Sequence, residues 1–128
     1  MRALIIGSSW VDKILAAKKT WEIRGSRTSV RETIGLIPSR FGTIVGLCDV
    51  VDCIRVASNE QFRKNARKAG MKPEEAILGH YKTTFAWVLA NPQNLNRPVP
   101  YKHRSGAVIW VKLDERTERA VQKQRQRG

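Results

Sequence analysis

The chain has 128 residues, enough for one compact domain with a buried core. Hydrophobic residues make up 41% of the sequence and charged residues 27%, a balance that excludes an intrinsically disordered chain. Lys and Arg total 24 against 11 Asp and Glu, so the net charge is +13 and the sequence predicts polyanionic partners. Its apolar stretches are too short for a membrane span or a signal peptide, so we expect a cytoplasmic protein that makes no membrane contact.

Strands are expected where apolar residues alternate with polar ones or run without a break. The segments with this pattern are residues 2–6, 20–24, 33–38, 43–54, 83–89 and 106–113. The stretch between the last two is rich in turn residues and contains Pro92, Pro98 and Pro100. This order predicts an α+β fold built on a small, mixed and mainly antiparallel β-barrel with flanking helices.

Helices are expected where capping residues precede apolar residues on one face. The first begins at Ser8 or Ser9 and ends near Lys18, and two more cover residues 59–69 and 73–79. A polar helix over residues 115–127 has almost no apolar stripe, so we expect it to fray. We therefore divide the chain into a folded domain over residues 1–113 and a basic C-terminal tail or helix over residues 114–128.

The densest cluster of polar residues follows the first helix. Lys19 precedes a strand that projects Thr20, Glu22 and Arg24 from one face, within about 17 Å of extended chain. The cations can bind a phosphate, and the carboxylate can accept hydrogen bonds from a base edge. The alternative is a solvated edge strand that carries a Glu22–Arg24 ion pair.

Residues 17–24, AKKTWEIR, resemble the GxKxxExR signature of ASCH domains in the PUA-like superfamily, with Ala17 in the place of the glycine. The resemblance extends over residues 3–113, through residues 9–12, residues 43–46, the prolines Pro92 and Pro98, and residues 106–110. It implies a PUA-like barrel with a cleft beside the signature, in a family thought to bind RNA or to act on nucleotides.

The resemblance also suggests two hydrolase reactions. One ASCH branch is similar to an amidohydrolase that deacetylates N4-acetylcytidine, and its catalytic lysine falls on Lys19. Glu22 occupies the position of its nucleophilic threonine, and Ala69 is the nearest match to its third catalytic residue, a glutamate. Thr20 is the only neighbouring hydroxyl on that strand, so it is the remaining candidate for a hydroxyl nucleophile. In a ribonuclease, Glu22 would deprotonate a ribose hydroxyl while Lys19 and Arg24 stabilise the phosphorane. A divalent metal would enter only in that case, and no other cofactor is expected.

Residues 55–72 form the most basic segment. On a helix over residues 59–69, Phe62, Ala66 and Ala69 face inward, and the cations that face outward are Arg63, Lys64, Arg67 and Lys68. The surplus of positive charge favours a surface that follows a phosphate backbone over an ordinary solvated face. Trp10 and Trp21 are candidates for stacking on an unpaired base, whereas Trp87 and Trp110 are expected in the core.

Asp49 lies among apolar neighbours, so we expect an ion pair with an arginine such as Arg24, or else a place in a cleft. Cys48, Cys53, His80 and His103 lack the spacing of metal ligands.

The leading hypothesis is an RNA-binding domain whose cleft recognises single-stranded or structured RNA, or a nucleotide. The candidate catalytic residues, if the chain is an enzyme, are Lys19, Glu22 and Arg24. The candidate nucleic-acid-binding residues are Trp10, Lys18, Lys19, Thr20, Trp21, Arg24, Arg27, Arg63, Lys64, Arg67 and Lys68. The alternatives are a hydrolase that uses the same cleft, and a structural protein whose charge serves assembly alone.

Overall fold

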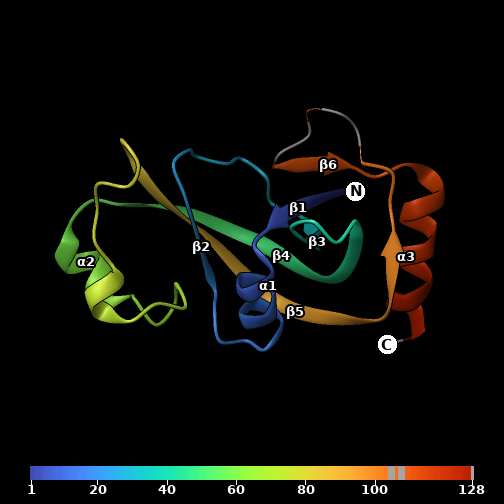
Figure 1. Cartoon of the computed structure of the whole chain (residues 1–128), viewed down its shortest axis with the longest axis horizontal. Helices are drawn as coiled ribbons and strands as arrows, with labels where there is room; N and C mark the ends of the chain where they lie inside the picture. Colours follow the sequence, from blue (N-terminus) through green and yellow to red (C-terminus); the bar gives the residue numbers. More distant parts are fainter. Residues whose placement is uncertain (104–105, 107–108, 128) are drawn as a thin grey trace.

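The structure is a computed structural model that describes residues 1–103, 106 and 109–127, with backbone only for the last two of these (Figure 1). The elements in chain order are β1 (Arg2–Ile6), α1 (Ser8–Leu15), β2 (Trp21–Arg24), β3 (Thr33–Pro38), β4 (Thr43–Val56), α2 (Asn59–Lys64), the 3₁₀ turn η1 (Pro73–Glu75), β5 (Thr84–Pro100), β6 (Trp110–Lys112) and α3 (Glu115–Arg127). The α+β class is therefore confirmed. The final expected strand, over residues 106–113, lies partly outside the described residues.

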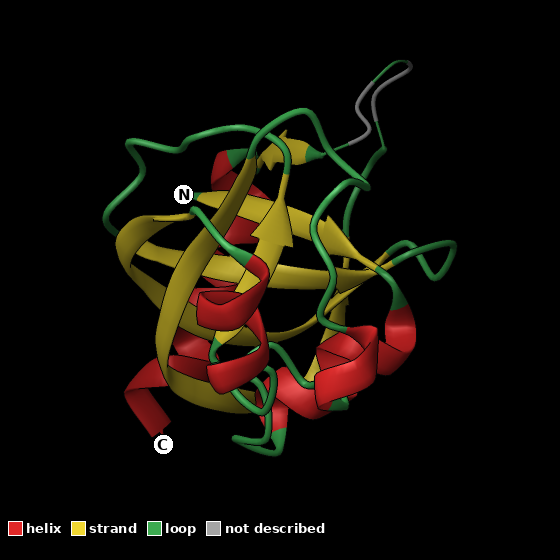
Figure 2. Ribbon diagram, turned by 90° about the vertical axis from the view of Figure 1, so that its left-hand side faces the viewer, coloured by secondary structure: helices red, strands yellow, loops and turns green. Residues whose placement is uncertain are grey.

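The strands form one six-stranded sheet in the order β2-β5-β4-β3-β1-β6. Among the pairings of the described residues, β1 with β3 alone is parallel, so the sheet is mixed and mainly antiparallel, as the sequence predicts. Figure 2 shows the sheet curving strongly around the interior. In the described part of the chain no ladder joins the two edge strands β2 and β6, so the sheet is open there and barrel closure stays a prediction.

The prolines that were expected in a turn-rich stretch instead lie in β5. Register shifts interrupt the pairing of β5 with β4 near Pro92, and the pairing has a gap between Asn94 and Val99 that contains Pro98. Proline lacks an N–H donor, so bulges and unpaired intervals are the strand positions that tolerate it. The prolines therefore do interrupt regular strand pairing, as expected, but the prediction that their segment is a turn-rich connection was wrong, because it is part of β5.

The helix α2 ends earlier than expected, at Lys64, and residues 65–70 continue as turns. Phe62, Ala66 and Ala69 are nevertheless buried together against Trp21 and Val56, as the predicted inward face requires. The helix expected over residues 73–79 is reduced to the single turn η1, which has Pro73 in its first turn.

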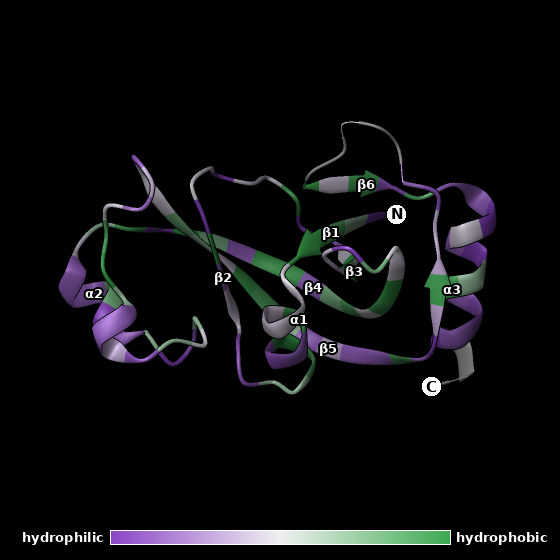
Figure 3. Cartoon of the chain, in the orientation of Figure 1, coloured by the Kyte–Doolittle hydropathy of each residue, from purple (hydrophilic) through white to green (hydrophobic). Residues whose placement is uncertain are grey.

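The terminal helix α3 packs against the sheet, and the expectation that it frays was wrong. Val121 is fully buried in a core cluster with Leu95 and Val99. The side-chain amide of Gln124 donates to the Arg97 carbonyl at 2.9 Å and accepts from the Arg97 N–H at 3.0 Å, which satisfies strand backbone in the unpaired interval of β5. The helices α2 and α3 lie at opposite ends of the longest axis (Figure 1), and both are mostly hydrophilic (Figure 3).

Candidate functional site

A cavity of about 620 Å³ opens between β1, α1, β2 and the segment that follows α2. Its lining from the first half of the chain includes Ile5, Ile6, Gly7, Trp10, Lys19, Glu22, Ile23 and Arg24. The rest of the lining comes from residues 62–84 and consists of Phe62, Met71, Glu75, Ile77, His80, Tyr81 and Thr84. We call this cavity the cleft; it combines apolar walls with a small group of convergent charges, as ligand sites usually do.

Glu22 is the centre of the charged group in the cleft. Its side chain is only 8% exposed, and its Oε2 accepts from Arg24 Nε at 2.9 Å and lies 2.8 Å from Arg24 Nη2. Its Oε1 lies 3.6 Å from Lys19 Nζ. The predicted convergence of these residues and the Glu22–Arg24 ion pair are both present, although the pair is partly buried and not on an exposed edge strand.

Lys19 is almost completely buried, with 2% of its side chain exposed. Its Nζ donates to the carbonyls of Trp21 at 2.6 Å and Ala69 at 2.8 Å, and lies 4.6 Å from the ring centroid of Trp10. Burial lowers the pKa of Lys19 from 10.5 to about 8, and the charge of Glu22 opposes this shift. The ammonium therefore ties α1, β2 and the segment after α2 together at the cleft wall.

Local backbone geometry brings Lys19 to this position. Ala17 adopts a φ of 61°, a left-handed conformation that favours glycine, and it turns the chain directly after α1. The N–H groups of Thr20 and Trp21 then donate to the Lys68 carbonyl at 2.8 and 2.9 Å. The glycine position of the ASCH signature thus coincides with a turn where a side chain costs energy.

Three of the predicted nucleic-acid contact residues have different surroundings from those expected, and so does Asp49. Trp21 is 4% exposed and packs against Phe62 and Val56, so it is not available to stack on a base, and this prediction was wrong. Thr20 is exposed but lines a small hollow near Asn91 and Pro92, not the cleft. Arg27 is exposed outside the cleft lining, with its guanidinium 5.1 Å from the Phe85 ring. Asp49 accepts hydrogen bonds from Thr33 and Asn91 instead of pairing with Arg24, and these bonds lower its pKa.

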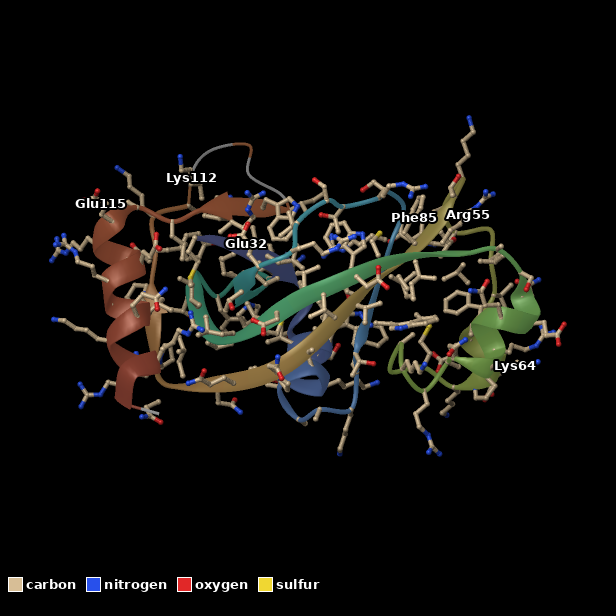
Figure 4. The ribbon with its side chains drawn as sticks, turned by 180° about the vertical axis from the view of Figure 1, so that it is seen from behind. Glu32, Arg55, Lys64, Phe85, Lys112 and Glu115 are labelled. Carbon is tan, nitrogen blue, oxygen red and sulfur yellow. The ribbon has the colours of Figure 1, made fainter. Side chains whose placement is uncertain are left out.

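A second hollow, of about 530 Å³, lies beside the cleft and is strongly basic. The cations that line it are Lys13, Lys18, Arg63, Lys64, Arg67 and Lys72. We call it the basic groove. Met71 lines both the cleft and the groove, so the two hollows are neighbours. Figure 4 labels Lys64 on α2, and its Nζ lies 3.2 Å from Glu60 Oε1.

Trp10 and Lys68 complete the predicted set. The half-buried Trp10 lines the cleft, and the ammonium groups of Lys13 and Lys19 lie 4.9 and 4.6 Å from its ring centroid. Lys68 is exposed but is not part of the groove lining, and its Nζ lies 5.5 Å from the ring of the buried Trp21. Among the described residues, Trp10 is therefore the one tryptophan that lines the cleft.

Sequence reasoning missed the wall of the cleft formed by residues 77–84. Ile77 is 58% exposed and Tyr81 36%, and both line the cavity. A Cβ on Gly25 would lie 2.6 Å from Tyr81 Cδ1, so the glycine allows the ring to approach the end of β2. Thr84 adds a buried hydroxyl. Tyr81 lies between the segments expected as a helix over residues 73–79 and a strand over residues 83–89, so no pattern marked it as part of a site.

Within the described residues no group of three or more His, Cys, Asp and Glu side chains is placed to hold a metal ion. In the same part of the chain, no helix is long and apolar enough to cross a membrane.

The family model of the ASCH domain matches residues 4–99, about three quarters of the chain. The chain belongs to the ASCH domain family. A comparison with curated proteins finds no match. Among solved structures, the ASCH protein from Zymomonas mobilis is similar to this ASCH domain with a TM-score of 0.74 and 14% identity, covering 95% of this chain and 93% of that one. Two mutants of that protein, a Tyr-to-Phe and a Ser-to-Ala variant, have TM-scores of 0.73 at the same identity and cover 95% of this chain, with 96% and 94% of theirs covered. This likeness supports the fold.

Proposed function

We propose that this ASCH domain binds single-stranded RNA, with one unpaired base in the cleft and the adjoining phosphates in the basic groove. The observation that carries the proposal is the adjacency of the two hollows, which share Met71. The cleft has apolar and aromatic walls and a group of charged side chains, and the basic groove is lined by cations. This is the division that single-strand recognition needs, because bases stack on aromatic side chains while phosphates require positive charge.

Each part of the cleft would have a separate task. Trp10 offers a ring face to a base, and the exposed Tyr81 and Ile77 lie on another part of the wall. Glu22 orients Arg24 by a hydrogen bond from Nε and an ion-pair contact with Nη2, and Arg24 Nη2 also donates to the Ile5 carbonyl at 3.2 Å. A guanidinium fixed in this way is prepared for a base carbonyl or phosphate oxygen without further loss of side-chain freedom.

The groove is tested with Arg63→Gln/Arg67→Gln, and the matched control is Arg40→Gln/Lys112→Gln, which removes two exposed cations elsewhere. Binding of a labelled oligouridylate is measured by fluorescence anisotropy over a series of salt concentrations. Loss of two phosphate contacts should reduce the salt slope of log K by about 1.4 and weaken binding at low salt by tenfold or more. Equal slopes for the groove variant and the control would refute the role of the groove.

The cleft is tested with Trp10→Ala, which removes a stacking face. We expect the affinity for the oligouridylate to fall about tenfold with the salt slope unchanged, because stacking is worth about 1–3 kcal/mol per base. The control is Trp10→Phe, which keeps an aromatic ring and should recover most of the affinity. Loss of affinity in both variants to the same extent, with unchanged thermal stability, would contradict stacking.

A hydrolase using the same cleft is the second candidate, and the environment of Lys19 is the observation that favours it. An amine with a pKa near 8 beside a carboxylate in a concave site is typical of catalytic groups. The hydroxyls in the cleft lining are those of Tyr81 and Thr84, while Thr20 lies elsewhere.

The hydrolase is tested by incubating the protein with labelled single-stranded RNA and, separately, with N4-acetylcytidine, each with and without divalent metal. Product that disappears in Lys19→Ala, while that variant still binds RNA, would establish an enzyme. Intact substrates in every reaction, with salt-sensitive RNA binding retained, would leave the binding function alone.

A further inference from the structure

The helix α3 presents a second cationic surface, separate from the cleft and the basic groove. Arg116, Arg119 and Lys123 follow one another at spacings of three and four residues, so they lie on one face of the helix. All three are exposed, and no acidic side chain in the described part of the chain forms an ion pair with them. The stripe is roughly 10 Å long, at about 1.5 Å of helix per residue.

The orientation of this stripe is fixed by contacts on the other side of the helix. Thr117 and Val121 are buried, and the Asp114 carboxylate accepts from the Thr117 N–H at 2.8 Å. Glu118 pairs with the N-terminal ammonium of Met1 at 2.9 Å, and Gln124 holds the backbone of β5. The helix is therefore docked, and its cationic face cannot rotate into the core.

The three cations of the stripe repel one another and form no ion pair in the described part of the chain. Like charges three or four residues apart destabilise a helix by roughly 0.2–0.5 kcal/mol per pair. Sequences usually break such local rules where a function requires it. An uncompensated row of guanidinium and ammonium groups on a fixed helix suits a regularly spaced polyanion.

A membrane surface fits this face less well than a phosphate backbone does. A helix that binds a bilayer needs an apolar face free to enter it. The apolar residues of α3, Val121 and the half-buried Ala120, are already packed against the core. The remaining exposed face is polar.

We propose that α3 is a second binding site for the RNA backbone, so that one protein molecule holds two RNA segments at once. The two sites are at opposite ends of the molecule, because α2 borders the basic groove and α3 lies at the far end of the long axis (Figure 1). A short strand bound in the cleft and groove leaves α3 free for another segment. The first of these segments rests on the proposed function, and the second site goes beyond it because α3 does not line the cleft or the basic groove.

The proposal is tested by bridging. Two short oligouridylates that carry a donor and an acceptor dye are mixed with the full chain at low salt, and energy transfer between them is measured. Wild type should bring the dyes together, with two strands bound per protein. The variant Arg116→Gln/Arg119→Gln/Lys123→Gln should lose the transfer and bind one strand, with its affinity for that strand changed less than threefold.

The matched variant Arg63→Gln/Arg67→Gln/Lys72→Gln removes three cations from the groove and should keep binding one strand through α3. Circular dichroism verifies that α3 remains helical in both variants. Energy transfer that persists in the α3 variant at the wild-type level would overturn the proposal. So would binding to phosphatidylserine vesicles that requires the three α3 cations while bridging does not. If wild type binds one strand without energy transfer, and that binding is lost in the α3 variant but unchanged in the groove variant, the proposed function fails and α3 alone binds RNA.

Discussion

Two groups of charges lie side by side in this ASCH domain in opposite environments. Lys19, Glu22 and Arg24 have side chains that are 2%, 8% and 18% exposed. In the neighbouring pair on α2, Glu60 and Lys64 are 74% and 73% exposed. Both groups contain an acid paired with a base, but the first is removed from water and the second is not. Burial makes the first group part of the fold, whereas exposure leaves Lys64, the cation of the second group, free to exchange partners.

The sharpest test of this difference is Glu22→Gln. The substitution keeps the shape of the side chain but leaves Lys19 and Arg24 facing each other without an anion. We expect the free energy of unfolding to fall by about 3–5 kcal/mol, the usual effect of removing one partner from a buried pair. Urea denaturation at pH 7 measures it. A loss below 1 kcal/mol would show that water enters the cleft and screens these charges.

The second test uses the lowered pKa of Lys19. The unfolded chain holds this proton up to about pH 10.5, whereas the folded chain releases it near pH 8. Between these values the unfolded state binds more protons, so the contribution of Lys19 makes stability rise with pH, by up to about 3 kcal/mol. Below pH 8 both states are protonated and the contribution is constant.

The measurement compares wild type with Lys19→Met in urea denaturation at pH 7, 8.5 and 10. The raised pKa of Cys48, about 12, has the opposite effect above pH 9, but it is present in both proteins and cancels in the difference. The stability of wild type relative to the variant should increase over this range. Parallel pH profiles would place the pKa of Lys19 at its ordinary value.

The sequence predicted that Lys19, Glu22 and Arg24 lie together, but it did not predict which residues pack around them. Alternation along residues 20–24 places Glu22 and Arg24 on one side of the strand, which is a local rule and holds in the structure. Whether Trp21 is accessible depends on Phe62 and Ala66, some forty residues later, and no local pattern contains that contact. The same limit explains why α3 was expected to fray. Val121 is buried against Leu95 and Val99, and the prolines around these residues had not indicated a strand.

A third test acts on the turn that leads into the buried cluster. Ala17 has a φ of 61°, and a glycine there would remove the steric cost of the left-handed conformation. Glycine also raises the conformational entropy of the unfolded chain, which offsets part of this gain. The net effect of Ala17→Gly should be a rise of about 0.5–1 kcal/mol in the free energy of unfolding. Ala16→Gly, at the preceding residue with a φ of −83°, is the control and should be neutral or destabilising. Destabilisation by both substitutions would mean that the turn is not strained.

The smallest expected effect on stability completes the comparison. Glu60→Gln removes the acid from the exposed pair on α2, and an exposed pair at this spacing contributes about 0.3–0.5 kcal/mol. The free energy of unfolding should therefore change by less than 0.5 kcal/mol. Lys64 loses its competing anion in the groove, so the affinity for an oligouridylate at low salt should rise about twofold. A stability loss as large as that of Glu22→Gln would show that the two groups do not differ, and unchanged affinity would mean that Lys64 makes no phosphate contact.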